Sequence, residues 1–151
     1  MVMISNFSEY YKLVQYLTRY TKKQLGLTMG VSNFIEIFDE QYYDNLKGGI
    51  LEAFGNIFKN NMKVYLYPLL DKDTGEIINS DNLKLENNMK EFYKFFKVNN
   101  KIRDLEFNYD FLEIFSKDIL KKIKNNEKGW EDKVPKGISE MIVKNKMFGY
   151  K

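Results

Sequence analysis

Residues 62–68 read Met-Lys-Val-Tyr-Leu-Tyr-Pro, and this stretch decides the fold class. Apolar side chains alternate with Lys or Tyr along it, and a period of two is typical of a β-strand. The polar residues 71–75 then turn the chain into Glu-Ile-Ile at 76–78, which predicts the return strand of a hairpin. Because two strands alone are only marginally stable in water, we expect the hairpin to pack on helices. The extended piece over 101–107 is a candidate third strand.

Helical spacing of apolar residues dominates the chain on both sides of this stretch. It predicts helices at about 7–25 (with Gly26 as the stop), 50–59 and 88–98, and three more that begin after Gly30, at Asp110 and at Pro135. No linker rich in Pro, Gly or Ser and no repeat divides the sequence. The sequence therefore predicts an α+β fold: a helix-dominated single domain over residues 1–151, with about six helices and a small antiparallel β-hairpin or three-stranded sheet.

The composition excludes several classes of chemistry, because the chain has no histidine and no cysteine. Histidine is the only side chain that ordinarily titrates near neutrality, and cysteine is the strongest common nucleophile. A Ser-His-Asp or Cys-His site, a zinc finger, imidazole-ligated iron and a disulfide are all excluded. An enzyme built from this chain would depend on carboxylates, lysines, tyrosines, backbone amides or a bound divalent ion.

The net charge is small, so a charged site has to come from local clustering. The chain carries 24 Lys and Arg against 21 Asp and Glu, a formal net charge of +3. Residues 1–30 hold four basic side chains against Glu9 alone, residues 117–151 hold ten lysines against five acids, and the stretch 36–91 is acidic. These asymmetries indicate a molecule with a basic end rather than a uniformly basic surface.

The basic residues of the first predicted helix share one face. A helix over 7–25 places Lys12, Tyr16, Arg19 and Lys23 on that face. Lys22 lies at its flank. Closely spaced cations suit phosphates, and a Tyr ring can stack on a base or donate a hydrogen bond. We therefore predict an anion-binding site on this helix. The alternative is a solvated face that keeps an aromatic-rich protein in solution.

Carboxylates form a second helical pattern. Glu36, Glu40 and Asp44 recur at helical spacing after Gly30. Such groups can hold Mg²⁺ or act as an acid–base pair, although a catalytic pair generally needs one desolvated member. The apolar side of this pattern faces the other way, so it favours a solvated face or a surface for a basic partner.

Three glycines lie in or beside the helix expected over 50–59. Gly48 and Gly49 precede it, and a helix N-terminus offers free N–H groups, which predicts a backbone nest for phosphate. The alternative is simple punctuation between helices. Gly55 lies inside the helix, where glycine costs about 1 kcal/mol relative to alanine. That cost suggests a close helix crossing or the approach of a ligand to the backbone.

Aromatic residues supply two further candidates. Trp130 lies in a glycine-containing loop, which predicts an interface anchor because indole supplies a large apolar area and one N–H donor. Its alternative is a loop staple over the junction of the last two helices. Tyr65 and Tyr67 share the non-aliphatic face of the expected strand, where they either line a ligand surface or pack under a helix.

Five segments spread over most of the chain carry a resemblance: GGILEAFG at 48–55, VYLYP at 64–68, WE at 130–131, VP at 134–135 and MFGY at 147–150. They resemble a group of small bacterial proteins labelled nicotinate-nucleotide adenylyltransferase. The resemblance implies an enzyme of nucleotide metabolism. Enzymes of that class carry an HxGH phosphate-binding motif, which a chain without histidine lacks, so no catalytic residue is transferred.

Three functions are open from the sequence. The first is a non-catalytic cytoplasmic binding module, with an anionic ligand or a protein as its partner and with no catalytic residue, cofactor or metal site assigned. The second is an enzyme of nucleotide (NAD-linked) metabolism that would use Lys or Arg for phosphates and carboxylates with Mg²⁺. The third is a protein–protein adaptor or oligomer that exposes part of its aromatic surplus. No apolar run nears the roughly 20 residues of a membrane span, so no membrane partner is expected.

Overall fold

A computed structural model describes residues 3–151 and confirms the α+β class. The chain divides into two compact units, Met1–Glu106 and Phe107–Lys151, which we call unit 1 and unit 2. Each has its own cluster of buried side chains. Seven α-helices lie within residues 3–151, close to the six expected. The single domain over 1–151 stays a prediction, and the two units are described separately below.

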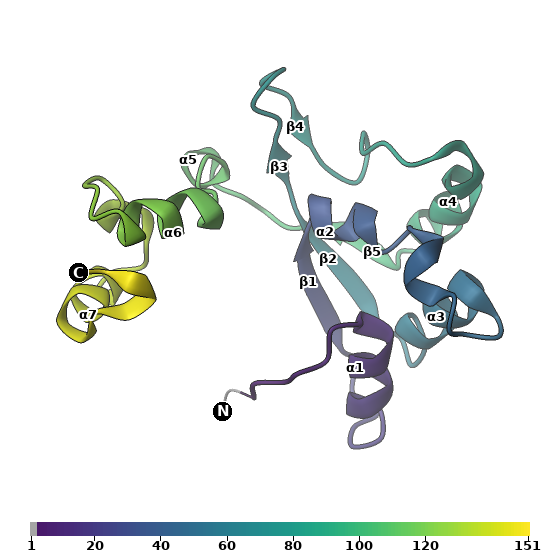
Figure 1. Cartoon of the computed structure of the whole chain (residues 1–151). Coiled ribbons are helices and arrows are strands. Elements are labelled where there is room, and N and C mark those ends of the chain that lie inside the picture. Colours follow the sequence, from purple (N-terminus) through teal and green to yellow (C-terminus); the bar gives the residue numbers. More distant parts are fainter. Residues whose placement is uncertain (1–2) are drawn as a thin grey trace. The chain divides into compact units, whose positions relative to one another are not determined.

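A three-stranded parallel sheet forms the centre of unit 1 (Figure 1). Its order is β1 (Gly26–Gly30), β2 (Lys63–Tyr67) and β5 (Ile102–Asp104). The strand at 62–68 and the third strand within 101–107 are therefore confirmed. The antiparallel pair is a separate one, between β3 (Leu69–Leu70) and β4 (Ile77–Ile78).

The first strand of the predicted hairpin was wrong. Residues 77–78 pair with residues 69–70 and not with the strand at 63–67. Pro68 lies between these two strands, and proline lacks the N–H that a continuous ladder needs. Both edges of β2 are occupied by parallel neighbours, which leaves no edge for a returning strand.

The first predicted helix was too long, and the sequence analysis missed β1. Helix α1 spans Tyr10–Leu17, where Thr18 Oγ1 donates a hydrogen bond to the Val14 carbonyl oxygen at 2.8 Å. Gly26, the expected helix stop, begins the strand instead. A Cβ at Gly26 would lie 2.8 Å from Cε2 of Tyr65, so glycine there lets the ring lie against the sheet. Tyr65 and Tyr67 are partly buried on the face of β2 opposite Val64 and Leu66.

The remaining short elements of unit 1 pack around one face of the sheet. They are α2 (Val31–Glu36), the 3₁₀ turn η1 (Glu40–Tyr43), α3 (Gly49–Ile57), the 3₁₀ turn η2 (Asn87–Met89) and α4 (Lys90–Val98). Helix α3 lies alongside α1, and α4 contacts β5. The helix expected after Gly30 is thus much shorter than its apolar pattern indicated, because α2 ends at Glu36.

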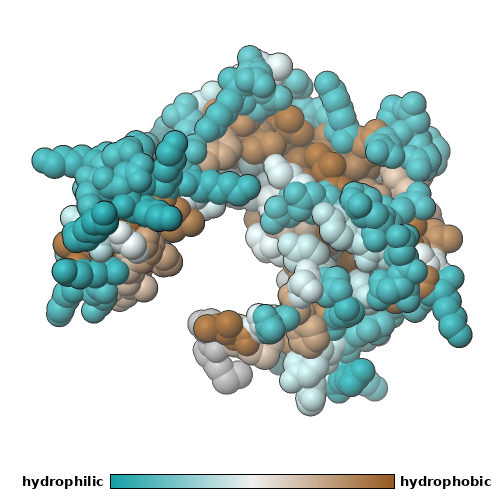
Figure 2. All heavy atoms as spheres, viewed as in Figure 1, coloured by the Kyte–Doolittle hydropathy of each residue, from teal (hydrophilic) through white to brown (hydrophobic). Residues whose placement is uncertain are grey.

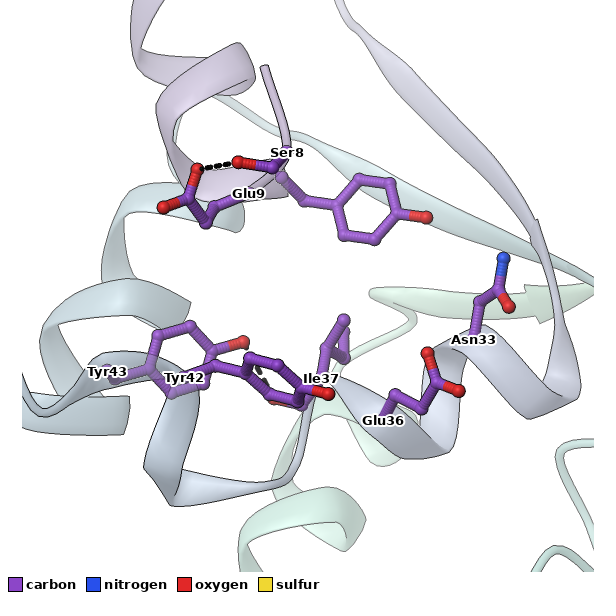
Figure 3. Close-up of a pocket in the computed structure, with 8 residues that line it drawn as sticks. Ser8, Glu9, Asn33, Glu36, Ile37, Tyr42 and Tyr43 are labelled. Atoms are coloured by element: carbon purple, nitrogen blue, oxygen red, sulfur yellow. Dashed lines mark hydrogen bonds between the residues drawn. The ribbon is translucent and has the colours of Figure 1, made fainter. Parts of the chain in front are cut away.

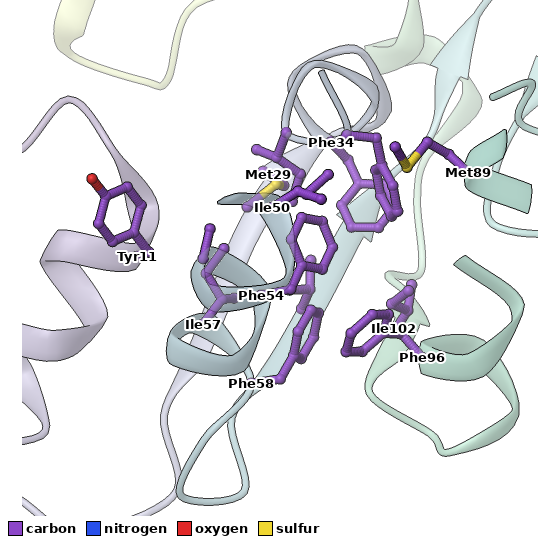
Figure 4. Close-up of a cluster of buried hydrophobic side chains, with 14 of the residues drawn as sticks. Tyr11, Met29, Phe34, Ile50, Phe54, Ile57, Phe58, Met89, Phe96 and Ile102 are labelled. Carbon is purple, nitrogen blue, oxygen red and sulfur yellow. The ribbon is translucent and has the colours of Figure 1, made fainter. Parts of the chain in front are cut away.

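Aromatic rings fill the core of unit 1. Phe54 is 1% exposed, and its ring centroid lies 4.8 Å from that of Phe38 and 4.9 Å from that of Phe92. Phe58 stacks on Phe96 with centroids 4.4 Å apart. Figure 4 shows Phe54 and Phe58 reaching from α3 toward Phe96 of α4. Val64 and Leu66 of β2 are fully buried beneath these rings and close the core on the sheet side.

Gly55 does not mark a close helix crossing, because a Cβ built there meets no heavy atom within 4 Å. Gly55→Ala should therefore raise the free energy of unfolding by about 1 kcal/mol, the usual difference between these residues inside a helix. Urea denaturation followed by far-UV circular dichroism measures this. Gly75→Ala is the matched control and should destabilise the protein, since Gly75 has a φ of +70°. Destabilisation by Gly55→Ala would contradict the packing described.

Unit 2 is a small helical unit closed by the only tryptophan of the chain. It contains α5 (Tyr109–Leu112), α6 (Ser116–Lys124), the 3₁₀ turn η3 (Glu131–Lys133), α7 (Ile138–Asn145) and the 3₁₀ turn η4 (Met147–Gly149). The helix expected from Asp110 is thus divided in two. Its buried cluster consists of Ile123, Trp130 and Ile142. Figure 2 shows hydrophilic residues over most of the visible face around α5 and α6.

Within residues 3–151, no helix combines the length and the apolar character that crossing a bilayer requires.

Candidate functional site

The predicted basic residues do not lie on one helix. Lys12 and Tyr16 belong to α1, but the helix ends at Leu17, so Arg19, Lys22 and Lys23 lie in the turn that follows. Backbone hydrogen bonds with 3₁₀ spacing form this turn, from the Arg19 N–H to the Tyr16 carbonyl oxygen and from the Tyr20 N–H to that of Leu17. Thr21 Oγ1 then accepts from the Lys23 N–H at 3.1 Å. The expectation of a continuous helical stripe was wrong.

Lys12 is occupied by a partner of its own. Its Nζ lies 2.5 Å from Oε1 of Glu9, which also accepts a hydrogen bond from Ser8 at its other oxygen. The hydrogen bond from Lys12 is the largest cause that lowers the pKa of Glu9, and the one from Ser8 is the next. The hydrogen bond between Lys12 and Glu9 also raises the pKa of Lys12. Lys12 therefore neutralises Glu9 rather than adding to a free positive surface.

The remaining residues form a compact surface that we call the basic turn: Tyr16, Arg19, Tyr20, Lys22 and Lys23. The three cations are exposed, and none of them forms an ion pair with any residue in 3–151. The ring centroids of Tyr16 and Tyr20 are 5.1 Å apart, and that of Phe7 is 5.4 Å from Tyr16. Tyr20 is 74% exposed. No acidic residue occurs between Glu9 and Glu36 in the sequence, so no nearby carboxylate of this segment cancels the charge.

The Gly48–Gly49 turn is already used by a carboxylate of the protein. The Gly48 N–H donates to Oε2 of Glu52 at 3.0 Å, and Gly49, with a φ of +53°, begins α3. An external phosphate at this helix start would have to displace Glu52. The phosphate nest stays a prediction, and the geometry supports a self-capped helix.

Trp130 lies inside unit 2 at 1% exposure. Its ring packs edge-on to Tyr150 with centroids 6.3 Å apart, and it contacts Ile123 and Ile142. The Glu131 carboxylate accepts hydrogen bonds from the N–H groups of Gly129 and Trp130 and so holds the loop. An interface anchor has to present its ring to a partner, whereas this ring is part of the core. Trp130 thus has the position of a loop staple, which was the alternative to an interface anchor.

The carboxylates after Gly30 belong to different elements and do not form one stripe. Glu36 ends α2, Glu40 begins η1 and Asp44 follows η1. Glu36 lines a pocket of about 230 Å³ between the start of α1 and the α2–η1 segment (Figure 3). Glu40 lines a second pocket, which Glu36 also lines, and the other charged residues of its walls are Asp39, Lys84 and Glu86. The sequence analysis missed the first pocket, because its walls come from residues 8 to 43 and no local pattern joins them.

One buried tyrosine of unit 1, Tyr43, and one partly buried tyrosine, Tyr93, give a pH dependence. Burial raises the pKa of Tyr43 to about 12, and it does the same for Tyr93. Tyr43 donates to the Ile37 carbonyl oxygen at 2.8 Å, and Tyr93 donates to that of Ser80 at 2.6 Å. An unfolded tyrosine ionises near pH 10. The stabilisation by these protonated phenols is therefore complete below about pH 10 and is lost as the pH rises through about 12.

Absorbance at 295 nm during alkaline titration measures this dependence. The folded protein should retain a component that ionises near pH 12, and Tyr43→Phe should remove part of it. Unfolding in urea should move the same component to near pH 10. If Tyr43→Phe reduces the absorbance change only near pH 10, the burial described for Tyr43 is wrong.

The basic turn is therefore the sequence-predicted site that the structure leaves most accessible. It combines unpaired cations with exposed rings. No family model matches the chain, and neither does any curated protein or solved structure.

Proposed function

We propose that this protein is a non-catalytic cytoplasmic binding module that holds an anionic partner at the basic turn. The observation that carries the proposal is the pair of exposed rings, Tyr16 and Tyr20, beside three cations that have no ion-pair partner in residues 3–151. Unpaired cations attract phosphates, and an exposed aromatic face accepts a base without regard to its sequence. Single-stranded nucleic acid supplies both groups.

The lysines of unit 2 offer a weaker alternative surface. The hollow in that unit is lined by Lys121, Lys122 and Lys133 but also by three acids, Glu113, Asp118 and Glu127. Positive and negative groups are thus both present around it. The basic turn has no acid in its own segment, so its field on a phosphate is less cancelled.

Fluorescence anisotropy with labelled octathymidylate tests the proposal. Three phosphate contacts predict that the logarithm of the association constant falls with the logarithm of salt concentration with a slope of about −2. The double reversal Arg19→Glu/Lys23→Glu should weaken binding by about tenfold or more at low salt. Lys47→Glu/Lys90→Glu is the control with the same change in net charge, made at exposed lysines outside the turn. It should change binding much less.

An abasic oligonucleotide with the same number of phosphates separates charge from stacking. Loss of stacking should weaken binding roughly tenfold, because each stacked base contributes about 1–3 kcal/mol. The proposal is wrong if both double variants weaken binding equally, or if the oligonucleotide does not bind at low salt. Both variants should keep the circular dichroism of the wild type, which shows that they fold.

The enzyme of nucleotide metabolism stays an alternative that rests on the sequence resemblance. A deep pocket in which Glu36 or Glu40 faces Arg19 would favour it. The two pockets that these carboxylates line in the described part of the chain do not have Arg19 among their walls. The geometry therefore supports the binding module better.

Self-association is a second candidate, because one apolar groove of unit 1 opens to solvent. Leu51 of α3 is 67% exposed and Phe95 of α4 is 60% exposed, and both line a hollow whose floor includes Gly55. A second copy of the chain would cover these side chains. Sedimentation velocity over a range of concentrations tests this: a dimer that Phe95→Glu dissociates supports it, and a monomer at every concentration excludes it.

A further inference from the structure

A pocket with charged and aromatic walls lies between the start of α1 and the α2–η1 segment of unit 1, away from the basic turn at the other end of α1. Its volume is about 230 Å³, and its walls are Ser8, Glu9, Tyr10, Asn33, Glu36, Ile37, Tyr42 and Tyr43. Figure 3 shows Ser8 and Glu9 on one side and Tyr42, Tyr43, Ile37 and Glu36 on the other. The pocket thus joins three elements that are separate in the sequence.

The charged groups of this pocket are negative. Glu9 and Glu36 supply two carboxylates, and no Lys or Arg is among the lining residues in the described part of the chain. Glu9 shares its charge with Lys12, whereas the Glu36 carboxylate has no hydrogen-bond or ion-pair partner within residues 3–151. One negative charge is therefore available to a ligand.

The base of the pocket is apolar and held in place. Ile37 and Tyr43 are buried, and the Tyr43 hydroxyl is fixed by its hydrogen bond to the Ile37 carbonyl oxygen. The Tyr43 ring also packs edge-on to Tyr11, with centroids 6.1 Å apart. Tyr10 and Tyr42 add two less buried rings to the walls. Tyrosine faces attract cations, and a rigid base reduces the entropy that binding has to overcome.

We propose that this pocket binds a small organic cation, an alkylammonium or a guanidinium ion. The cation would lie between the Glu36 carboxylate and the tyrosine rings, so that charge and ring faces act on the same ligand. A metal ion fits less well, because no group of three acidic residues in the described part of the chain could hold one. The proposal concerns a different surface from the basic turn and a ligand of the opposite charge.

Nuclear magnetic resonance titrations with n-butylammonium and n-butylguanidinium test the proposal. We expect saturable amide shifts at residues 8–10 and 33–43, with a dissociation constant of about 1 mM for such small ligands. Butanol and butyrate have the same apolar tail, and neither should give these saturable shifts. If butanol gives the same shifts, the pocket recognises an apolar tail and the proposal is wrong.

Matched variants separate the pocket from general attraction of cations to an acidic surface. Glu36→Gln and Tyr42→Leu should each weaken binding by about fivefold. Asp44→Asn is the control, since it removes the same charge as Glu36→Gln from an exposed residue that does not line the pocket. Equal weakening by Asp44→Asn and Glu36→Gln, or shifts that do not saturate, would overturn the proposal. The unperturbed spectrum of each variant outside the pocket shows that it folds.

Discussion

Phe54→Ala should lower the free energy of unfolding of unit 1 by about 3–5 kcal/mol, the usual cost of removing a fully buried phenylalanine. Phe54 packs against Phe38 from the turn after α2 and against Phe92 and Phe96 of α4, with its ring centroid 5.3 Å from that of Phe96. The loss would leave a cavity that rigid neighbouring rings cannot fill. Urea denaturation followed by far-UV circular dichroism measures the change.

Phe95→Ala is the matched control, because Phe95 lies on the same helix as Phe96 but is mostly exposed. It should change the free energy of unfolding by less than about 1 kcal/mol. A cost for Phe54→Ala as small as that of Phe95→Ala would show that the ring cluster is not the core of unit 1.

Trp130→Ala should unfold unit 2. The loss of a buried indole costs about 3–5 kcal/mol of stability. The free energy of unfolding of a small unit with few buried side chains is rarely larger than that. In the ¹H–¹⁵N spectrum, the resonances of residues 107–151 should collapse to the positions of an unfolded chain. Those of unit 1 should keep their dispersion, because the buried cluster of unit 1 includes no residue beyond Ile102.

Phe148→Ala is the control within unit 2, since Phe148 is an exposed aromatic residue. It should leave the spectrum of unit 2 dispersed. Collapse of both units in Trp130→Ala would mean that the chain folds as one cooperative domain over 1–151. Dispersed resonances throughout unit 2 would mean that the indole does not hold the unit together.

The α+β class could be predicted because its signals are local. The alternation around Val64 and Leu66 identified the central strand, and helical spacing located α3 and α4 to within a few residues. The direction of the sheet could not be predicted in this way. It depends on how β1 and β5 pair with β2, and the sequence of β1, Gly-Leu-Thr-Met-Gly, has little strand propensity and forms a strand by pairing with β2.

The candidate site could be predicted only in part, for a similar reason. Composition located the cations, but the apolar periodicity predicted a helix up to Leu25. Helix α1 ends at Leu17, and backbone hydrogen bonds with 3₁₀ spacing begin at Arg19. The pairing of Lys12 with Glu9 also had no signal beyond their spacing of three. The cation pocket depends on tertiary packing of α1 against the α2–η1 segment, which no single stretch of sequence encodes.

Mapping amide shifts on addition of octathymidylate at low salt tests the proposed function most directly. The basic turn predicts that the largest shifts lie at residues 16–23, that they decrease as salt is added, and that Arg19→Glu/Lys23→Glu removes them. Shifts concentrated at residues 117–136 would place the anionic partner on the lysines of unit 2 and contradict the proposal, and so would the absence of any shift.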